Sequence, residues 1–389
     1  PVKLVMTREE QFNTTAVRQG FYARIKTGVK RDGKIVAEEI LFLWDAGAYA
    51  DYGVNIGRAA GYSCTGPYEV PNVKCDSLTV YTNHPYGTAY RGFGHAELHF
   101  AVERQMDLVA RAIGMDPVEL RLRNAALPGR ITATGEKLRE DAGRVDECIK
   151  AVAEAIGWRK VRPKQVGEKF RGIGIAALWK APAMPSSTSS SAILKLNEDG
   201  SITLSISTTE LGQGTPTAFA QMVAEELQVP IEKVKVVTKR ETDFSPYTWQ
   251  TVASRSLFMD GNAVLRAVED FKRQVKATAS ELLDMPPEAL EIADERVFIA
   301  RESERGMPLK AVATCGVLPD GRGIHGPILG YGYDTAEGLT NLDPETGQGL
   351  PALMWTFGAQ GAEVEVDPET GDVKVLKVVS AFDIGKAIN

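Results

Sequence analysis

The sequence predicts an α+β fold, in which antiparallel strand pairs alternate with helices that begin at glycine loops. Three separated segments have the pattern of a strand, a tight turn and a returning strand, and each ends in an acidic residue, a spacer and a glycine. Between these segments, apolar residues recur at three- and four-residue steps, which indicates amphipathic helices. Strand pairs combined with separate helices are typical of α+β chains.

Turn residues mark the three predicted strand pairs. Asp32-Gly33, Asp199-Gly200 and Thr370-Gly371 each interrupt a β-rich run, and glycine allows the left-handed backbone that many tight turns need. Two interpretations stay open because strand–turn–strand units are common: the likeness is a coincidence, or one supersecondary unit is used three times. The predicted pairs are residues 21–30 with 35–43, 192–196 with 202–207, and 362–366 with 373–381.

The central helix follows a glycine loop, Arg91-Gly92-Phe93-Gly94. Apolar residues recur at helical spacing until Gly114, and Asp116-Pro117 begins the next helix, where proline suits the first turn. Residues 316–361 are rich in glycine and proline and show little periodicity, so a long irregular excursion is expected there. Further helices are predicted at residues 145–156, 215–227 and 259–283.

One glycine pattern is interpreted as a coincidence. Residues 321–326 match GxGxxG, the pattern of dinucleotide-binding turns. They follow Pro319-Asp320 and are cut off by Pro327, whereas such a turn needs a strand before it and a helix after it. We therefore assign no nucleotide site to this segment.

Composition places the chain among ordinary globular proteins. Its 389 residues, 43% hydrophobic and 25% charged, suffice for several cores, and we expect two domains, residues 1–160 and 161–389. The net charge of −6 argues against a nucleic-acid partner, and no apolar run approaches the roughly 20 residues of a membrane span. The amino-terminal PVKLVMTREEQ has neither a signal-peptide core nor an initiator methionine, so we expect a processed or cut piece.

The sequence shows no pattern of metal ligands. The cysteines at positions 64, 75, 148 and 315 form no CxxC pair, and His95 and His99 belong to no HExxH pattern. We therefore expect free, mostly buried thiols in a reducing compartment, which indicates a cytoplasmic location. No metal site built from this chain alone is expected.

Three loops that precede helices are the candidate binding elements: residues 91–94, 210–214 and 251–256. Free N–H groups and the positive end of the helix dipole favour an anion such as phosphate at such starts. In the second loop, Thr215 is predicted as the N-cap and Pro216 as the first helical residue. On these residues alone, plain helix capping and the binding of a large anionic cofactor both stay open.

Five motifs in order resemble the large subunit of the molybdenum hydroxylases, the xanthine dehydrogenase and aldehyde oxidase family, which also includes carbon monoxide and nicotinate dehydrogenases. The resemblance runs from Pro1 to Asn389 and implies a molybdopterin-binding α+β chain from the middle portion of that subunit. The motifs are TAYRGFG with the acidic helix and GMDPVELRLRN after it, TTELGQG, VASRS, GAEVEVDPETG and AFDIGKAIN.

The resemblance implies roles for residues in all three loops. Arg91 and Gly92 would lie against the molybdenum cofactor. Phe93 would stack on an aromatic substrate, and Arg58 would help to orient that substrate. The cofactor-binding positions implied in the other two loops are Leu211, Gly212, Gln213, Ala253, Ser254, Arg255 and Ser256.

Three departures from the family pattern narrow the expected chemistry. Residues 95–97 are His-Ala-Glu, where many members have Gly-Pro-Gln. Gly92 and Phe93 stand where the copper-type carbon monoxide enzymes carry a cysteine, so oxidation of carbon monoxide is not expected. The second stacking ring of the xanthine branch should fall near Pro182, where the nearest aromatic residue is Trp179, so we do not expect a purine sandwich.

The activity implied is hydroxylation of an aromatic N-heterocycle or an aldehyde with oxygen taken from water. The catalytic glutamate is expected beyond Asn389, so no catalytic residue is assigned in this chain. The cofactor is expected in a dinucleotide form, with iron–sulfur clusters and FAD on other domains or subunits of an oligomer.

Two rival functions stay open. The first is a catalytically inactive, cofactor-binding or structural fragment of such an enzyme. The second is an unrelated nucleotide-binding enzyme, which would need a Walker-type lysine or a paired-aspartate metal site near the loops, and the sequence has neither there.

Overall fold

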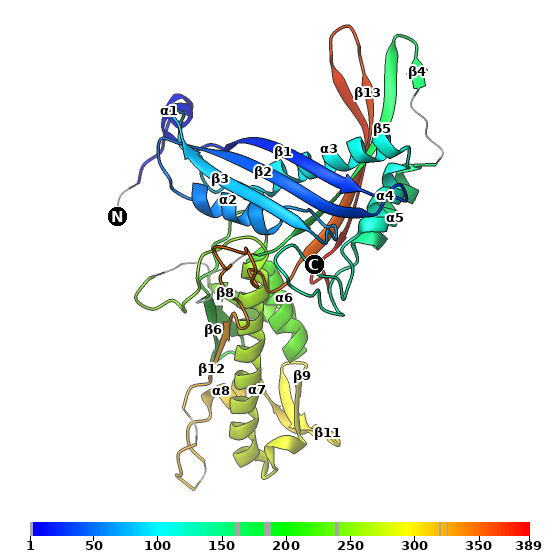
Figure 1. Ribbon diagram of the computed structural model, residues 1–389. Helices are drawn as coiled ribbons and strands as arrows, with labels where there is room; N and C mark the ends of the chain where they lie inside the picture. The colour runs from blue at the N-terminus through cyan, green and yellow to red at the C-terminus, as the bar shows by residue number, and fades with distance from the viewer. Residues whose placement is uncertain (1–2, 160–163, 183–187, 238–240, 319, 325) are drawn as a thin grey trace. The chain divides into compact units, whose positions relative to one another are not determined.

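The computed structural model describes residues 3–159, 164–182, 188–237, 241–318, 320–324 and 326–389. The chain divides into two compact units: unit 1 is Pro1–Ala183 with Leu339–Gly385, and unit 2 is Met184–Gly338 with Lys386–Asn389. Both units mix helices and strands, which confirms the α+β class (Figure 1). The division expected between residues 160 and 161 concerns sequence domains and stays a prediction.

The first sheet of unit 1 contains the first predicted strand pair. Strands β1 (Gly20–Val29) and β2 (Ile35–Gly47) are antiparallel, as the turn residues indicated. Strand β3 (Val73–Tyr81) lies parallel to β2, and the sequence analysis did not predict it. Because parallel neighbours need a crossover, helix α2 (Gly53–Tyr62) connects them and lies along one face of the sheet (Figure 1).

The second sheet of unit 1 is wholly antiparallel and joins strands from distant parts of the chain, in the order β14-β13-β5-β4. Its hairpin of β13 and β14 is the third predicted strand pair, and helix α5 packs on it. The strands are β4 (Lys164–Val166), β5 (Lys169–Lys180), β13 (Thr356–Val366) and β14 (Val373–Asp383); the remaining helices of the unit are α1 (Arg8–Thr14), α3 (His95–Ile113), α4 (Pro117–Asn124) and α5 (Val145–Ile156).

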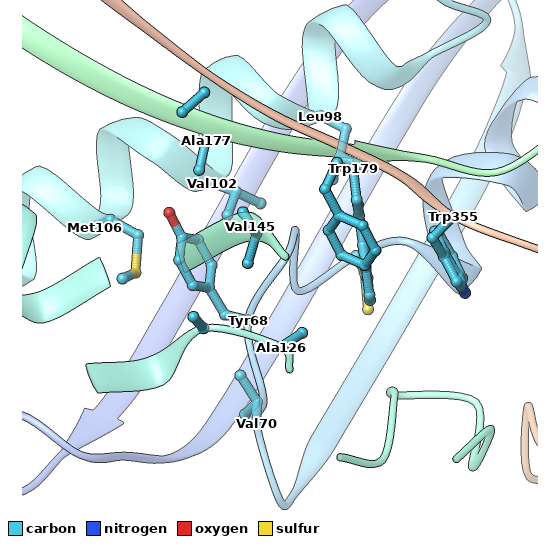
Figure 2. Close-up of a cluster of buried hydrophobic side chains, with 14 of the residues drawn as sticks. Tyr68, Val70, Leu98, Val102, Met106, Ala126, Val145, Ala177, Trp179 and Trp355 are labelled. Carbon is cyan, nitrogen blue, oxygen red and sulfur yellow. The ribbon is translucent and has the colours of Figure 1, made fainter. Parts of the chain in front are cut away.

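One apolar core lies between the helices and both sheets of unit 1. Trp179 of β5 stacks on Trp355 with ring centroids 4.1 Å apart, and both belong to the same core as Leu98 of α3 (Figure 2). The Tyr68 hydroxyl donates to Glu103, whose other oxygen accepts from Arg121 at 2.8 Å. Burying a charged pair is tolerable only with such complete hydrogen bonding, so this network fixes the position of α3.

Unit 2 is built around the long helix α7 (Gly261–Leu283), which packs on a four-stranded sheet and on α6 (Thr215–Leu227). Its core includes Leu194, Phe219 and Phe271. The sheet has the order β12-β6-β7-β8, and a smaller sheet has the order β11-β10-β9. The strands are β6 (Ser189–Leu196), β7 (Ile202–Ser205), β8 (Val234–Val237), β9 (Leu290–Ala293), β10 (Arg296–Ile299), β11 (Glu302–Pro308) and β12 (Leu329–Thr335), and the last helix is α8 (Leu309–Thr314).

The expectation of a long irregular segment at residues 316–361 was wrong in part, because it contains β12 and the start of β13. Along β12 the buried positions are Gly330, Gly332 and Asp334, while the tyrosines between them are exposed. A Cβ atom on Gly332 would collide with the backbone of α7. The strand therefore buries glycine against a helix, and an apolar alternation is missing from the sequence.

The predicted helix limits hold for most of the chain. Helices α5 and α6 have the expected bounds, and α3 ends at Gly114, which has φ of 68°. One turn of π-helix, Ser256–Asp260, precedes α7, so regular helix begins two residues later than expected. Among the helices of the described residues, none is both long and apolar enough to cross a membrane.

Candidate binding loops

The loop Arg91–Gly94 of unit 1 is a tight, left-handed turn that ends in helix α3. Gly92, Phe93 and Gly94 all have positive φ, at 102°, 52° and 81°. A Cβ atom on Gly94 would lie 2.9 Å from Cγ2 of Ile56, so only glycine fits there without a shift. Positive φ at a phenylalanine is strained, and such strain concentrates at functional sites.

The two side chains of this loop to which a ligand role was assigned have different surroundings. Arg91 is exposed, and its guanidinium forms no hydrogen bond or ion pair with the described residues. Phe93 is half-buried and makes an edge contact with Tyr52, with ring centroids 6.0 Å apart. Arg58 of α2 is exposed and donates to Oδ1 of Asn341 at 3.2 Å.

His95, which belongs to the segment that departs from the family pattern, links the loop to a neighbouring hydroxyl through two hydrogen bonds. It is 4% exposed, and Nδ1 lies 3.3 Å from the carbonyl oxygen of Phe93 while Nε2 lies 3.1 Å from the Ser63 hydroxyl. The carbonyl can only accept, so Nδ1 carries the proton and Ser63 donates to Nε2. Burial lowers the pKa of His95 well below its usual range, which keeps the ring neutral.

His99 is a second buried histidine, one helical turn further along α3. Its Nε2 donates to the carbonyl oxygen of Trp179 at 2.8 Å. Burial lowers its pKa to about 4. The two rings, 5.9 Å apart, are therefore neutral links that join α3 to the loop and to strand β5.

The loop 210–214 of unit 2 bonds to itself. The Glu210 carboxylate accepts from the N–H groups of Gly212 at 2.6 Å and Gly214 at 3.1 Å, and these hydrogen bonds hold its pKa below the usual range. Oε1 of Gln213 accepts from the N–H of Leu211 at 2.6 Å. A carboxylate of the chain thus occupies the position that an anion would take at the start of α6.

The predicted cap of helix α6 was wrong by one residue. Gly214, with φ of 81°, is the N-cap, and Thr215 is already helical. The hydroxyl of Thr215 lies 3.4 Å from the Glu210 carboxylate, so it donates to an acid instead of capping the helix. Pro216 still lies in the first turn, where its missing N–H costs nothing.

The loop 251–256 combines an exposed edge with a buried ion pair. Ala253 and Ser254 are exposed, and Ala253 has φ of 47°. Arg255 is fully buried, where its Nη2 lies 3.4 Å from the Asp260 carboxylate. Burial lowers the pKa of Arg255, and its guanidinium is turned into the protein. The hydroxyl of Ser256 is buried and has no hydrogen-bond partner in the described part of the chain.

The structure brings the second and third loops together within unit 2. The N–H of Thr209 donates to the Thr251 hydroxyl at 2.8 Å, and the Thr208 hydroxyl donates to Asp260. Arg91, Phe93 and Arg58 belong to unit 1.

Sequence reasoning missed Arg18, which contacts the backbone of Arg91, 73 residues later in the chain. No local motif marks such a contact. The described residues contain no group of three or more His, Cys, Asp or Glu that could hold a metal ion. The four cysteines are free; Cys64 and Cys148 are buried, and Cys75 and Cys315 are half-buried.

Comparison with known proteins identifies the chain's relatives. A family model for a molybdopterin cofactor-binding domain matches residues 151–389, and a second model of that description matches residues 1–125. A putative xanthine dehydrogenase molybdenum-binding subunit of Escherichia coli (strain K12) is 32% identical over 100% of this chain and 50% of its own length.

Solved structures show the same relationship. The aldehyde oxidoreductase from Desulfovibrio gigas is 28% identical, with a TM-score of 0.81, over 98% of this chain and 39% of that one. A quinoline 2-oxidoreductase from Pseudomonas putida 86 shares the fold at 24% identity, with a TM-score of 0.83, over 99% of this chain and 50% of that one. The chain spans about half the length of three curated bacterial relatives that match it over its whole length. It belongs to the molybdopterin cofactor-binding domain family, as part of a molybdenum hydroxylase large subunit.

Proposed function

We propose that this chain supplies part of the cofactor and substrate site of a molybdenum hydroxylase, which hydroxylates an aromatic N-heterocycle or an aldehyde with oxygen from water. One observation carries the proposal: the loops 210–214 and 251–256 of unit 2 lie together. They combine glycines that have no described atom within 4 Å of a built Cβ with the buried Ser256 hydroxyl, which has no hydrogen-bond partner among the described residues. The motifs in these loops and the membership of the family support the same assignment.

The residues of unit 2 fit a pterin with an attached phosphate. A Cβ atom built on Gly212 or Gly214 would meet no described atom within 4 Å, so a flat ligand can approach the backbone there. The Ser256 hydroxyl would gain the partner that it lacks among the described residues. The positions proposed to contact the cofactor are Leu211, Gly212, Gln213, Ala253, Ser254, Arg255 and Ser256, together with Arg91 and Gly92 of unit 1.

Two of these positions would act differently from the others. The Gln213 amide already bonds within its loop, donating to the carbonyl oxygen of Thr209 at 2.7 Å, so cofactor binding would exchange these bonds. The buried side chain of Arg255 would act on the cofactor only through the backbone that its pairing with Asp260 holds in place.

On the substrate side, Phe93 would offer a ring edge or face and Arg58 a charged donor. Trp179 does not supply a second stacking ring, because it is fully buried against Trp355. This supports a pocket with one aromatic wall, which suits aldehydes and single-ring or fused heterocycles held from one side.

When bound, the molybdenum cofactor supplies the oxygen-transfer and two-electron chemistry. The share of this chain is to orient cofactor and substrate, with Arg91 donating to an acceptor and Phe93 holding a ring. The base, the iron–sulfur clusters and FAD would come from other parts of the protein or from partner subunits. We propose a cytoplasmic oligomer and a dinucleotide form of the cofactor.

The test is an isotope experiment on the full-length protein, purified with its natural partners. A panel of aromatic N-heterocycles and aldehydes is turned over in water enriched in ¹⁸O, and the products are examined by mass spectrometry. We expect the label in the new hydroxyl or carboxyl group. Unlabelled product, with oxygen from O₂, would contradict the proposal, and no turnover in a molybdenum-loaded complex would favour an inactive cofactor-binding protein.

A further inference from the structure

Arg18 lies just before strand β1 and contacts the loop Arg91–Gly94 and both of its flanks. Its Nη2 donates to the carbonyl oxygen of Arg91 at 2.5 Å, and its Nη1 donates to Oε1 of Glu97 at 2.9 Å. Its guanidinium carbon lies 4.6 Å from the centroid of the Tyr90 ring. One planar cation therefore links the residue before the loop, the loop itself and the first turn of α3.

The backbone beside Arg18 is fixed to the same stretch of chain. The N–H of Val17 donates to the carbonyl oxygen of Tyr86, and the N–H of Thr88 donates to that of Val17, both at 3.1 Å. The Glu97 side chain is only 11% exposed, whereas the side chain of Arg18 is 36% exposed, so the ion pair is shielded from water on the Glu97 side alone. These contacts restrict where the guanidinium can lie.

A small polar cavity lies on this side of the loop. Gln19 is 6% exposed, and neither atom of its side-chain amide has a hydrogen-bond partner among the described residues; the same holds for Oε2 of Glu97. Buried polar atoms in folded proteins almost always have partners. The cavity, of about 10 Å³, can hold a single water molecule. Its lining residues are Arg18, Gln19, Ile56, Thr88, Tyr90, Gly94 and Glu97.

We propose that Arg18 is the positioning residue of the Arg91–Gly94 loop, and that one water molecule bound by Gln19 and Glu97 completes this polar support. The inference deepens the proposed function and rests on it, since the loop would present Arg91 and Phe93 to cofactor and substrate. Arg18 holds the backbone of Arg91, which leaves the Arg91 guanidinium to a ligand.

The test compares two variants of the full-length protein, purified with its natural partners, by amide hydrogen exchange. Arg18→Met removes the three contacts, whereas the control Arg104→Met removes an exposed arginine from helix α3. We expect amides 91–97 to exchange at least roughly tenfold faster in the Arg18 variant, because hydrogen bonds to a charged donor hold the loop closed. Arg104→Met should leave them unchanged. Equal exchange in the two variants would overturn the proposal.

Two further measurements keep the inference testable if Arg18→Met fails to fold. Arg18→Lys keeps the positive charge but loses the planar guanidinium, so we expect amides 91–97 to exchange faster than in the wild type but more slowly than in Arg18→Met. Exchange at the wild-type rate in Arg18→Lys would contradict the role of the guanidinium. A crystal structure should show one water between the Gln19 amide and Glu97, and a dry cavity would overturn that part. Loop exchange is read independently of molybdenum content, so a failure of the proposed function can be recognised separately.

Discussion

The loop Arg91–Gly94 of unit 1 and the loop 210–214 of unit 2 both precede helices, but they are held in different ways. The first is held from outside, because Arg18 binds the carbonyl oxygen of Arg91 and neutral His95 binds that of Phe93. The second holds itself, because Glu210 and Gln213 bond to the N–H groups of their own loop.

This difference has a consequence for ligand binding. A loop that is held from outside keeps its own side chains available, and the Arg91 guanidinium has no partner in the described chain. A loop that bonds to itself must exchange those bonds when a ligand arrives, which costs part of the binding free energy. The two loops should therefore respond differently to substitution.

The largest effect is expected at the buried ion pair behind the loops of unit 2. Asp260→Ala would leave the fully buried guanidinium of Arg255 without its counter-charge. We expect a loss of about 3–5 kcal/mol in the free energy of unfolding, measured in urea. The exposed pair of Arg139 and Asp141 is the control, and Asp141→Ala should cause no measurable change. A loss below about 1 kcal/mol in the Asp260 variant would show that this pair does not support the loops.

A matched pair of glycines tests the two loops directly. Gly94 and Gly214 are both N-caps with φ of 81°, so an alanine at either would be strained by about 1–2 kcal/mol. Only at Gly94 would the new Cβ also press on Ile56, at 2.9 Å. Overpacking of this kind costs about 1–3 kcal/mol more. Gly94→Ala should thus lower the Tm further than Gly214→Ala. An equal decrease in Tm in the two variants would contradict the close packing of Gly94 against Ile56.

The smallest effect is a pH dependence that should belong to unit 1. The folded pKa of His99, about 4, is depressed below the ordinary value of 6.5, so the unfolded chain binds more protons between these pH values. The stability from neutral His99 is complete above pH 6.5 and is lost as the pH falls toward 4, by roughly 1 kcal/mol at pH 5.5. Urea unfolding of wild type and His99→Gln at several pH values tests this. An identical acid dependence in the two proteins would rule it out.

Local signals explain which parts of the fold could be predicted from the sequence. The three strand pairs carry glycine turns, and α6 has a proline in its first turn. Strand β12 escaped prediction because glycine occupies two of its buried positions, and no periodicity of large apolar residues results. The predicted Thr215 cap was wrong because the Thr215 hydroxyl donates to the carboxylate of Glu210, five residues earlier, and does not bond to the start of the helix.

The proposed binding residues also divide into those that local sequence signals mark and those that only the fold brings together. The backbone conformation of residues 92–94 and the exposure of Gly212 could be anticipated, since glycine marks both places. The burial of Arg255 depends on Asp260 and on Ser190. Nη1 of Arg255 lies 2.8 Å from the Ser190 hydroxyl, and no local motif links Ser190 to the loop because the two are 65 residues apart. The contact of Arg18 with Arg91 joins positions 73 residues apart and follows only from the fold.

The most direct test of the central claim, that these loops hold a molybdenum cofactor, is the molybdenum and pterin content of the complex purified from its source with this chain in it. Molybdenum is measured by elemental analysis, and pterin by fluorescence after oxidation. We predict about one molybdenum and one pterin for each chain. An intact complex with neither would contradict the account, and every cofactor role given to the three loops would then fall.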